Sequence, residues 1–277
     1  MTEFETILDT HSFQTTKTLK EQLNLLGIKS GDHLIVHSSL KSMGWIAGGA
    51  QAGVEALMEL VTPNGTIIMP AQSADNSEPS YWMLPPVPEA WYEPIRQTIP
   101  AYDPNLTPLR GMGKIAECFH RHPKTIRSPH PAHSFMAWGL HADDWMSEHP
   151  LEDSFGPSSP LGKMLNADVK VIMIGVSYES CTALHLSEYL APECTVFPQG
   201  AAIMQDGERI WTTFDMADVD SDLFPELGMA FEEMKPGIAL DGKLGQANCK
   251  IVPMKPLVDF GTLWVTEKRL SEVVVEK

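Results

Sequence analysis

Short apolar runs alternate along the chain with segments whose apolar residues recur at helical spacing. The runs are too short for ordinary helices and are typical of buried strands. They lie at residues 33–37, 66–70, 134–138 and 171–176. The segments with helical spacing lie at residues 13–29, 51–61 and 113–122. Residues 33–70 follow the order strand, glycine-containing loop, helix, strand, which predicts parallel strands joined by a right-handed crossover. The pattern therefore predicts an α/β fold.

The C-terminal half continues this alternation with shorter elements. A helix is expected to begin at Ser159-Pro160, because proline is favoured in the first turn. Strand residues on both sides of the turn at 205–208 predict a hairpin over 201–214. The remaining expectations are an acidic loop at 215–222, a helix at 224–234, two strand-like pieces within 238–252, a last helix over 256–262 and a frayed tail at 273–277. No repeat or linker divides the chain, so residues 1–277 are expected to form one domain.

Residues 72–108 differ in kind from the rest of the chain. Eight prolines lie between Pro79 and Pro108, a density that excludes a long helix or a central strand. Aromatic residues are interspersed among them, which is typical of a packed flap and untypical of disorder. Trp91, Tyr92 and Asp103 are candidates to line a pocket for a polar, cationic ligand, although the aromatic rings are equally suited to anchoring the flap to the core.

Charge narrows the classes of partner. The chain has 36 acidic and 20 basic residues and a formal net charge of −16. Such a surface repels phosphate backbones and anionic lipid and attracts cations, so we expect neither a nucleic-acid nor a membrane partner. The N-terminus has no basic region followed by an apolar one, and no long apolar run occurs, so we expect a cytoplasmic protein. Four widely spaced cysteines indicate neither a zinc knuckle nor a disulfide framework.

Three polar residues follow the apolar run 171–176 at helical spacing. Thr182, His185 and Glu188 recur every third residue, so they are expected to share one narrow arc of a helix. This arc would lie at the carboxyl end of a strand, where ligands bind in open α/β sheets. A carboxylate one turn from an imidazole fixes its tautomer and stabilises its protonated form, as a general base requires. The same spacing also suits a salt bridge or a buried structural histidine, and spacing alone leaves both readings open.

Other catalytic arrangements have less support in the sequence. No GxSxG motif precedes a helix, so a serine hydrolase is not indicated. Cys181 is a possible thiol nucleophile, but it has no cationic neighbour in sequence to lower its pKa. His130 and His133 have a spacing that some metal sites use, yet no cysteine or carboxylate accompanies them at fixed spacing. Structural or substrate-contacting roles are expected for these two histidines, and no metal is expected.

A glycine-containing loop joins the first strand to the next helix. Gly44, Gly48 and Gly49 lie where free backbone N–H groups and the helix dipole favour an anion. They match neither the dinucleotide-binding nor the P-loop motif, and glycines in a turn often serve the backbone alone. The loop is therefore a candidate phosphate site with a conformational alternative.

Four stretches together resemble the aminoglycoside 3-N-acetyltransferase family, in particular its acidic bacillar-type members. They are VHSSLKSMGWIAGGAQAGVEALMELVTPNGTIIMPAQS, RSPHPAHSFMAWG, SPLGKML and IGVSYESCTALHLSE, and VDFGTLW near the C-terminus extends the likeness. The resemblance implies acetyl-CoA-dependent transfer of an acetyl group to an amine. It also implies a three-layer α/β/α sandwich around a mixed, partly parallel sheet, with a small β-hairpin and helical C-terminal extension.

The resemblance also implies residue roles. His185 would be the general base, oriented by Glu188, and Thr182 would help to hold the thioester oxygen. Coenzyme A would contact a set of residues centred on the glycine loop: His37, Ser38, Ser39, Leu40, Lys41, Gly44, Trp45, Gly48, Gly49, Arg127, Ser128 and Phe135. The amine substrate would face Asp75, Tyr81, Trp91 and Asp103.

The substrate implied is an aminoglycoside or a similar cationic amine, which fits the negative charge of the chain. Direct transfer in a ternary complex is the expected mechanism, and a monomer or a homodimer is the expected assembly. Three alternatives stay open. They are an acyltransferase acting on a different amine, a metal-dependent hydrolase built on His130, His133, His185 and Glu188, and a protein that binds coenzyme A without catalysis.

Overall fold

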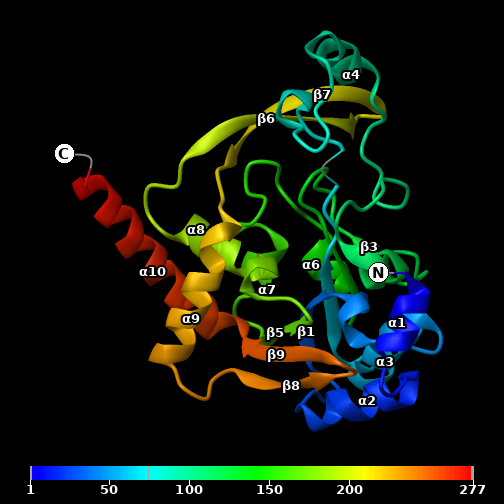
Figure 1. Cartoon of the computed structure of the whole chain (residues 1–277). Helices are drawn as coiled ribbons and strands as arrows, with labels where there is room; N and C mark the ends of the chain where they lie inside the picture. The colour runs from blue at the N-terminus through cyan, green and yellow to red at the C-terminus, as the bar shows by residue number, and fades with distance from the viewer. Residues whose placement is uncertain (1, 74, 276–277) are drawn as a thin grey trace.

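The computed structural model describes residues 2–73 and 75–275, which form a seven-stranded mixed sheet with helices on both faces (Figure 1). The strands are β1 (His33–Ser38), β2 (Thr66–Pro70), β3 (Ile126–Arg127), β4 (Phe135–Gly139), β5 (Val169–Ile174), β8 (Leu240–Leu244) and β9 (Ala247–Pro253). Their order is β3-β4-β2-β1-β5-β9-β8. The central strand β1 runs parallel to β2 and β5, and the outer pairs are antiparallel. The predicted βαβ unit and the mixed sheet are therefore confirmed.

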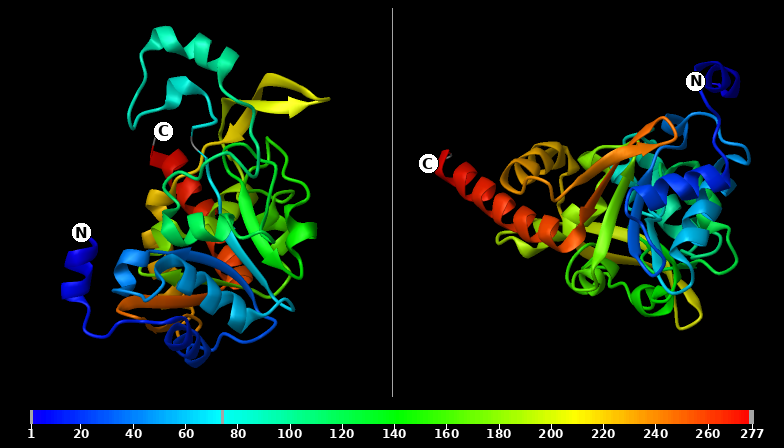
Figure 2. Two further views of the ribbon diagram at one scale, coloured as in Figure 1. Left: turned by 90° about the vertical axis from the view of Figure 1, so that its right-hand side faces the viewer. Right: turned by 90° about the horizontal axis from the view of Figure 1, so that it is seen from below.

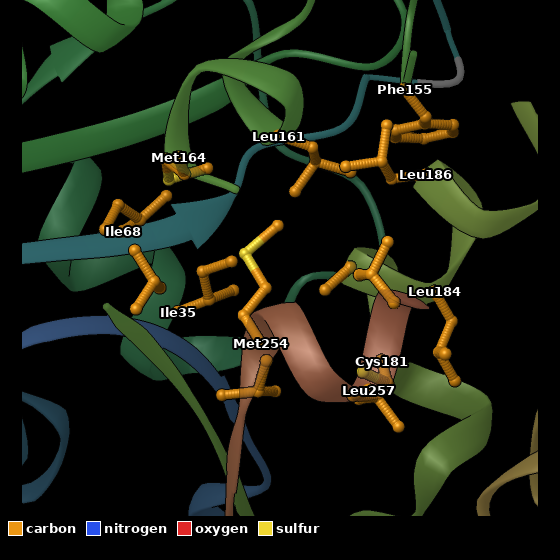
Figure 3. Packing of buried hydrophobic residues seen from close by; sticks show 14 of the residues in the cluster. Ile35, Ile68, Phe155, Leu161, Met164, Cys181, Leu184, Leu186, Met254 and Leu257 are labelled. Atoms are coloured by element: carbon orange, nitrogen blue, oxygen red, sulfur yellow. The ribbon is translucent and has the colours of Figure 1, made fainter. Parts of the chain in front are cut away.

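Side chains alternate across the sheet, and each face has its own core. Leu34 and Val36 pack with helices α2 (Thr16–Leu25), α3 (Gly49–Val61) and α5 (Gly113–His120). Ile35 points the other way, toward five helices on the opposite face. These are α6 (Ala142–Met146), α7 (Pro160–Met164), α8 (His185–Leu190), α9 (Phe224–Met234) and α10 (Met254–Val275). Figure 3 shows this second core, with Ile35 and Ile68 of the sheet facing Met164 and Met254. The predicted three-layer α/β/α arrangement follows.

Several predicted boundaries differ from the structure. Helix α2 begins after Thr15, whose side chain accepts the Thr18 N–H, and Gly27 at φ 88° turns the chain beyond it. Strand β5 lies two residues earlier than expected, because Gly175 at φ 66° ends it. Helix α1 (Glu3–Asp9) was not predicted, although Thr2 and Glu5 form a capping box. Helix α10 extends beyond its expected end at Thr262 and includes the first residues of the expected frayed tail. Residues 276–277 of that tail lie outside the described part of the chain.

A second sheet holds the flap. Strands β6 (Val196–Gln205) and β7 (Glu208–Ala217) form a hairpin that is longer than predicted and takes in the start of the expected acidic loop. Figures 1 and 2 show the flap, with helix α4 (Tyr92–Thr98), beside this hairpin and beyond the edge of the main sheet. Asn76 exchanges hydrogen bonds of 3.1 and 3.2 Å with the backbone of Ala202. The Arg209 guanidinium donates to the Ile99 carbonyl at 3.0 Å. Contacts far apart in sequence therefore order a segment too rich in proline to order itself.

Candidate active site

The parallel strands β1, β2 and β5 end at the same edge of the sheet, and a pocket of about 300 Å³ opens there. His37 and Ser38 line it from the end of β1, and Gln72 from just beyond β2. Thr182 and His185 line its opposite side. Thr182 lies on a single 3-10 turn that precedes helix α8, so the helix begins three residues later than the spacing predicts. The pocket therefore lies at the carboxyl ends of the parallel strands, where the sequence predicted a ligand site.

His185, which lines the pocket, forms a hydrogen-bonded pair with the buried Glu188. The His185 Nδ1 and the Glu188 Oε2 are 2.6 Å apart, and the Glu188 side chain is only 4% exposed. The other carboxylate oxygen accepts the Asp220 backbone N–H at 2.7 Å. The imidazole is stacked on Phe155 and packed against Phe224, with both ring centroids 4.7 Å away. Because the carboxylate accepts the proton on Nδ1, the lone pair of Nε2 is left for another proton.

His37 is a second histidine in the same pocket. Burial and then the neighbouring His185 lower the pKa of His37 to about 4, so its ring is neutral at pH 7. Its Nε2 atom is buried and has no hydrogen-bond partner among the described residues. An orphaned ring nitrogen in a pocket wall is expensive unless a ligand atom partners it. His37 is therefore equipped to contact a bound molecule.

The residues expected around coenzyme A fall into three groups. The first is His37 and Ser38 in the His185 pocket, the second is the loop 39–49, and the third is Arg127, Ser128 and Phe135. Ser39, Lys41 and Gly44 line a pocket of about 430 Å³ beside the first one, together with Asp9 and Gln246. Leu40 begins the 3-10 turn η1 (Leu40–Met43), and Gly48 and Gly49 have positive φ at the start of α3. Trp45 packs on Phe13 and donates its Nε1–H to Glu3 at 3.2 Å. The loop thus brings Lys41 and the glycine backbone to this pocket, and helix α1 forms one of the pocket walls.

Arg127, Ser128 and Phe135 form the third group, and all three point inward. The Arg127 guanidinium donates to the Ala71 and Thr107 carbonyls, each at 2.6 Å, and is buried. The Ser128 hydroxyl bonds to His149 Nδ1 at 2.9 Å, and neither Ser128 nor Phe135 is exposed. Neither the His185 pocket nor the pocket at the glycine loop is lined by these side chains, so their expected contact with coenzyme A stays a prediction.

The flap closes over a further pocket of about 430 Å³. Tyr81 lines it, with His133, Gln199, Arg110 and Gln72. Gln72 also lines the His185 pocket, so the two pockets adjoin. Of the other expected substrate residues, Asp75 pairs with Arg110 at the rim. The Asp103 carboxylate accepts the Asn105 and Leu106 N–H groups of a turn, and Trp91 is 56% exposed, and neither residue lines the flap pocket.

The competing chemistries find little support in the structure. Cys181 is fully buried, and burial raises the pKa of its thiol to about 12, so it is not a nucleophile at neutral pH. His130 uses both ring nitrogens on nearby backbone groups. Within residues 2–73 and 75–275, no group of three His, Cys, Asp or Glu side chains is arranged to hold a metal ion. The four residues of the hydrolase alternative therefore do not form a metal site in the described part of the chain.

Sequence reasoning missed several residues of the pockets. Gln72 carries a signal, since it lies two residues beyond the predicted strand 66–70, which was expected to run parallel to the first strand. Glu179 and Ser180 line the pocket from the 3-10 turn η4 (Tyr178–Ser180), which joins strand β5 to the segment that carries Thr182 and His185. Gln199 and Arg110 carry no signal in the sequence, because the hairpin and the flap reach the site through the tertiary fold alone.

No helix in the described part of the chain is long and apolar enough to cross a membrane.

Comparison with known proteins defines the class. The aminoglycoside 3-N-acetyltransferase family matches residues 35–266 of the chain. The prophage-derived aminoglycoside N(3')-acetyltransferase-like protein YokD of Bacillus subtilis is 43% identical over 93% of this chain and 95% of its own length. The crystal structure of YokD superimposes with a TM-score of 0.92 at 41% identity, covering 95% of this chain and 97% of that one.

Two further relatives extend the match. The aminoglycoside N(3)-acetyltransferase VII of Streptomyces paromomycinus is 33% identical, with 92% of both chains covered. A solved structure described as AAC-IIIb binary with CoASH has a TM-score of 0.82 at 27% identity, covering 93% of this chain and 98% of that one. The fold and the matches define an acyltransferase. The chain belongs to the aminoglycoside 3-N-acetyltransferase family, as the sequence resemblance predicted.

Proposed function

We propose that the protein transfers the acetyl group of acetyl-CoA to an amine of an aminoglycoside or a similar cationic substrate, with His185 as the general base. The observation that carries the proposal is the 2.6 Å contact between His185 Nδ1 and Glu188 in the wall of a pocket at the sheet edge. Glu188 is held in turn by the Asp220 N–H, so the imidazole has one tautomer and one orientation. A positioned base of this kind contributes about 10²- to 10⁴-fold to a rate.

Coenzyme A fits the residues at the glycine loop. Lys41 supplies a positive charge for a phosphate, and Ser39 and Gly44 line the same pocket. His37, whose Nε2 is orphaned, lies on β1 just before this loop and lines the same pocket as His185. Acetyl-CoA would supply an activated acyl carbonyl with a thiol leaving group. A relative whose solved structure is described as a complex with CoASH supports this choice of donor.

The roles of the protein groups follow from their positions. His185 removes a proton from the attacking amine through Nε2, and Glu188 stabilises the imidazolium that results. Thr182, which lines the pocket beside His185, donates to the carbonyl oxygen as it gains negative charge. The amine then carries the acetyl group, and the proton held by His185 is available to the departing thiolate. Direct attack by the amine requires no covalent acyl-enzyme, and the Cys181 thiol is fully buried.

A thiol-release assay with acetyl-CoA against a panel of amines tests the proposal. We expect turnover with aminoglycosides or other polyamines, and a loss of about 10²- to 10⁴-fold in kcat for His185→Gln with coenzyme A affinity retained. His11→Gln is the matched control, because that side chain is exposed and does not line the His185 pocket. Equal activity of His185→Gln and the wild type would rule out the assigned base.

An acyltransferase acting on another kind of amine is the second candidate. The chain is more similar to YokD, described as acetyltransferase-like, than to the Streptomyces enzyme described as an aminoglycoside acetyltransferase. The same assay distinguishes the two candidates, because turnover of simple amines without turnover of aminoglycosides supports the second.

A further inference from the structure

Helix α8 carries both members of the His185–Glu188 pair, yet it is only six residues long. So short a helix gains little stability from its own hydrogen bonds, and its position depends on what it packs against. Helix α8 packs on the C-terminal helix α10 (Figure 1). The contacts between these two helices therefore decide where the pair lies.

The backbone carbonyl of Glu188 lacks the partner that a helix ordinarily supplies. In an α-helix the carbonyl of one residue accepts the N–H of the fourth residue after it. For Glu188 that residue is Pro192, which has no N–H. The N–H of Ala191 is donated to the Ser187 carbonyl at 3.0 Å. Since Glu188 is buried, its carbonyl needs a donor from elsewhere in the protein.

Arg269 of helix α10 supplies this donor. Its Nη1 lies 3.1 Å from the Glu188 carbonyl oxygen, 3.3 Å from that of Ala191 and 2.8 Å from that of Pro192. A guanidinium stays charged and can only donate, so the direction of these hydrogen bonds is fixed. Positive side chains are favoured at the carboxyl end of a helix, where they bond to its last carbonyl groups. Arg269 therefore caps the helix that carries the pair, from a position 81 residues beyond Glu188.

Helix α10 also holds α8 at Ser187. The Ser187 hydroxyl donates to the Val258 carbonyl at 3.1 Å, and Ser187 is fully buried. A Cβ atom at Gly261 would lie 2.5 Å from the Ser187 Oγ, so the two helices meet here with no room for a side chain at residue 261. Val258, Gly261 and Arg269 share one face of α10 by their helical spacing. This face thus fixes α8 at two places.

We propose that Arg269 is a positioning residue for the reaction, which caps α8 at Glu188 and so holds the Glu188 carboxylate against His185 Nδ1. Glu188 is then fixed at three points. Its carboxylate oxygens bond to His185 and to the Asp220 N–H, and its backbone carbonyl bonds to Arg269. Arg269 lines neither the His185 pocket nor the pocket at the glycine loop, so it acts through Glu188. This inference rests on the proposed function, since it takes His185 as the base.

Steady-state kinetics with acetyl-CoA and an amine that the enzyme turns over give the first test. In Arg269→Ala we expect kcat to fall by about 10- to 100-fold, because a displacement of about 1 Å at a catalytic group costs about 10²-fold. Affinity for coenzyme A, measured by calorimetry, should be unchanged. Arg269→Lys, which keeps a charged donor, should recover part of kcat.

Lys268→Ala is the matched control, because it removes the neighbouring charge on α10, whose partner is Glu226 of α9. We expect its kcat to equal that of the wild type, and a thermal melt of each variant shows whether the fold is intact. Wild-type kcat in Arg269→Ala overturns the inference. A loss in Lys268→Ala as large as that in Arg269→Ala also overturns it.

The second test separates positioning from a general loosening of the fold. Glu188→Ala removes the carboxylate and keeps the backbone carbonyl that Arg269 caps. Because Arg269 acts through the carboxylate, adding Arg269→Ala to this variant should lower kcat by no more than about a further twofold. An equal fold-loss from Arg269→Ala in the wild-type and Glu188→Ala backgrounds overturns the inference, since effects of uncoupled residues multiply in the rate.

The third test needs no turnover. The short contact with Glu188 should give the His185 Nδ1 proton a far-downfield proton resonance, which is assigned by its absence in His185→Gln. We expect this resonance in the wild type and in Lys268→Ala, and its loss or broadening in Arg269→Ala. An unchanged resonance in Arg269→Ala overturns the inference. Full activity of His185→Gln contradicts the proposed function instead, and the resonance then decides separately whether Arg269 positions the pair.

Discussion

The two sides of the candidate site are built in different ways. On the sheet side, His185 and Glu188 come from one short helix that follows strand β5, and their contact joins residues three apart. On the flap side, Gln199 and His133 come from segments far apart in sequence. Hydrogen bonds between Asn76 and Ala202 hold the flap against the hairpin that carries Gln199. Spacing within one helix therefore builds the His185–Glu188 pair, whereas the pocket beneath the flap depends on long-range contacts that are easier to loosen.

The largest effect is expected on the sheet side, from Glu188→Gln. The new amide would accept the Asp220 N–H through its oxygen and offer an N–H to His185 Nδ1. This forces the ring proton onto Nε2, the nitrogen that must act as base, so kcat should fall by about 10³- to 10⁴-fold. Affinity for coenzyme A, measured by calorimetry, should be unchanged. Glu233→Gln, at an exposed position of α9, is the matched control. A loss of less than tenfold in Glu188→Gln would mean that the carboxylate does not orient the base.

Acid should destabilise the fold through the buried histidines His130 and His149, whose ring centroids lie 4.7 Å apart. Burial lowers the pKa of His130 well below its ordinary value of 6.5, and lowers that of His149 to about 4. The unfolded chain therefore binds more protons than the folded one once the pH falls below about 6.5. Each such histidine removes about 1.4 kcal/mol of stability per pH unit below that point.

Urea unfolding at pH 7, 6 and 5 measures this dependence. The free energy of unfolding should decrease as the pH falls through this range, before most carboxylates begin to titrate. The variant His130→Gln should show a smaller slope, and His11→Gln, altered at an exposed side chain, the wild-type slope. A pH-independent stability between pH 7 and 5 would contradict the neutral, buried state of these rings.

A smaller effect, confined to the flap side, is expected from Asn76→Ala. Asn76 is buried, and its loss leaves the Ala202 N–H without the side-chain acceptor it now has at 3.1 Å. An unmade hydrogen bond of this kind costs about 1–3 kcal/mol, so the flap should open about 10- to 100-fold more often. Limited proteolysis near the exposed Met83 and Leu84 measures the opening. Asn105→Ala, in an exposed turn, is the control. Equal cleavage of the two variants would show that the contact with the hairpin does not hold the flap in place.

The smallest effect is expected from Trp91→Ala. Trp91 is 56% exposed and does not line the flap pocket. Exposed substitutions away from special contacts change free energies by about 0.5 kcal/mol or less, so KM for the amine should change by no more than about twofold. A tenfold rise in KM would mean that the flap closes further around the substrate and brings Trp91 to it.

The same contrast explains what the sequence could predict. The βαβ unit and the His185–Glu188 pair depend on periodicity and short spacing, which can be read along the chain, whereas the mixed sheet was implied by the family resemblance. The inward orientation of the Arg127 side chain could not be predicted, because its hydrogen-bond partners Ala71 and Thr107 come close to it only in the folded chain. Gln199 likewise reaches the pocket on a hairpin whose position no local pattern fixes. Tertiary contacts, which set these positions, leave no periodic trace in sequence.

We expect the amine to attack the acetyl group directly, with His185 as its base and no acyl-enzyme. Rapid-mixing measurement of thiol release from acetyl-CoA, with and without an amine that the enzyme turns over, distinguishes direct attack from an acyl-enzyme. With direct attack, no thiol is released until the amine is present, and release then proceeds in step with amine acetylation. A burst of one thiol per enzyme molecule in the absence of amine would contradict it, because such a burst requires a covalent acyl-enzyme.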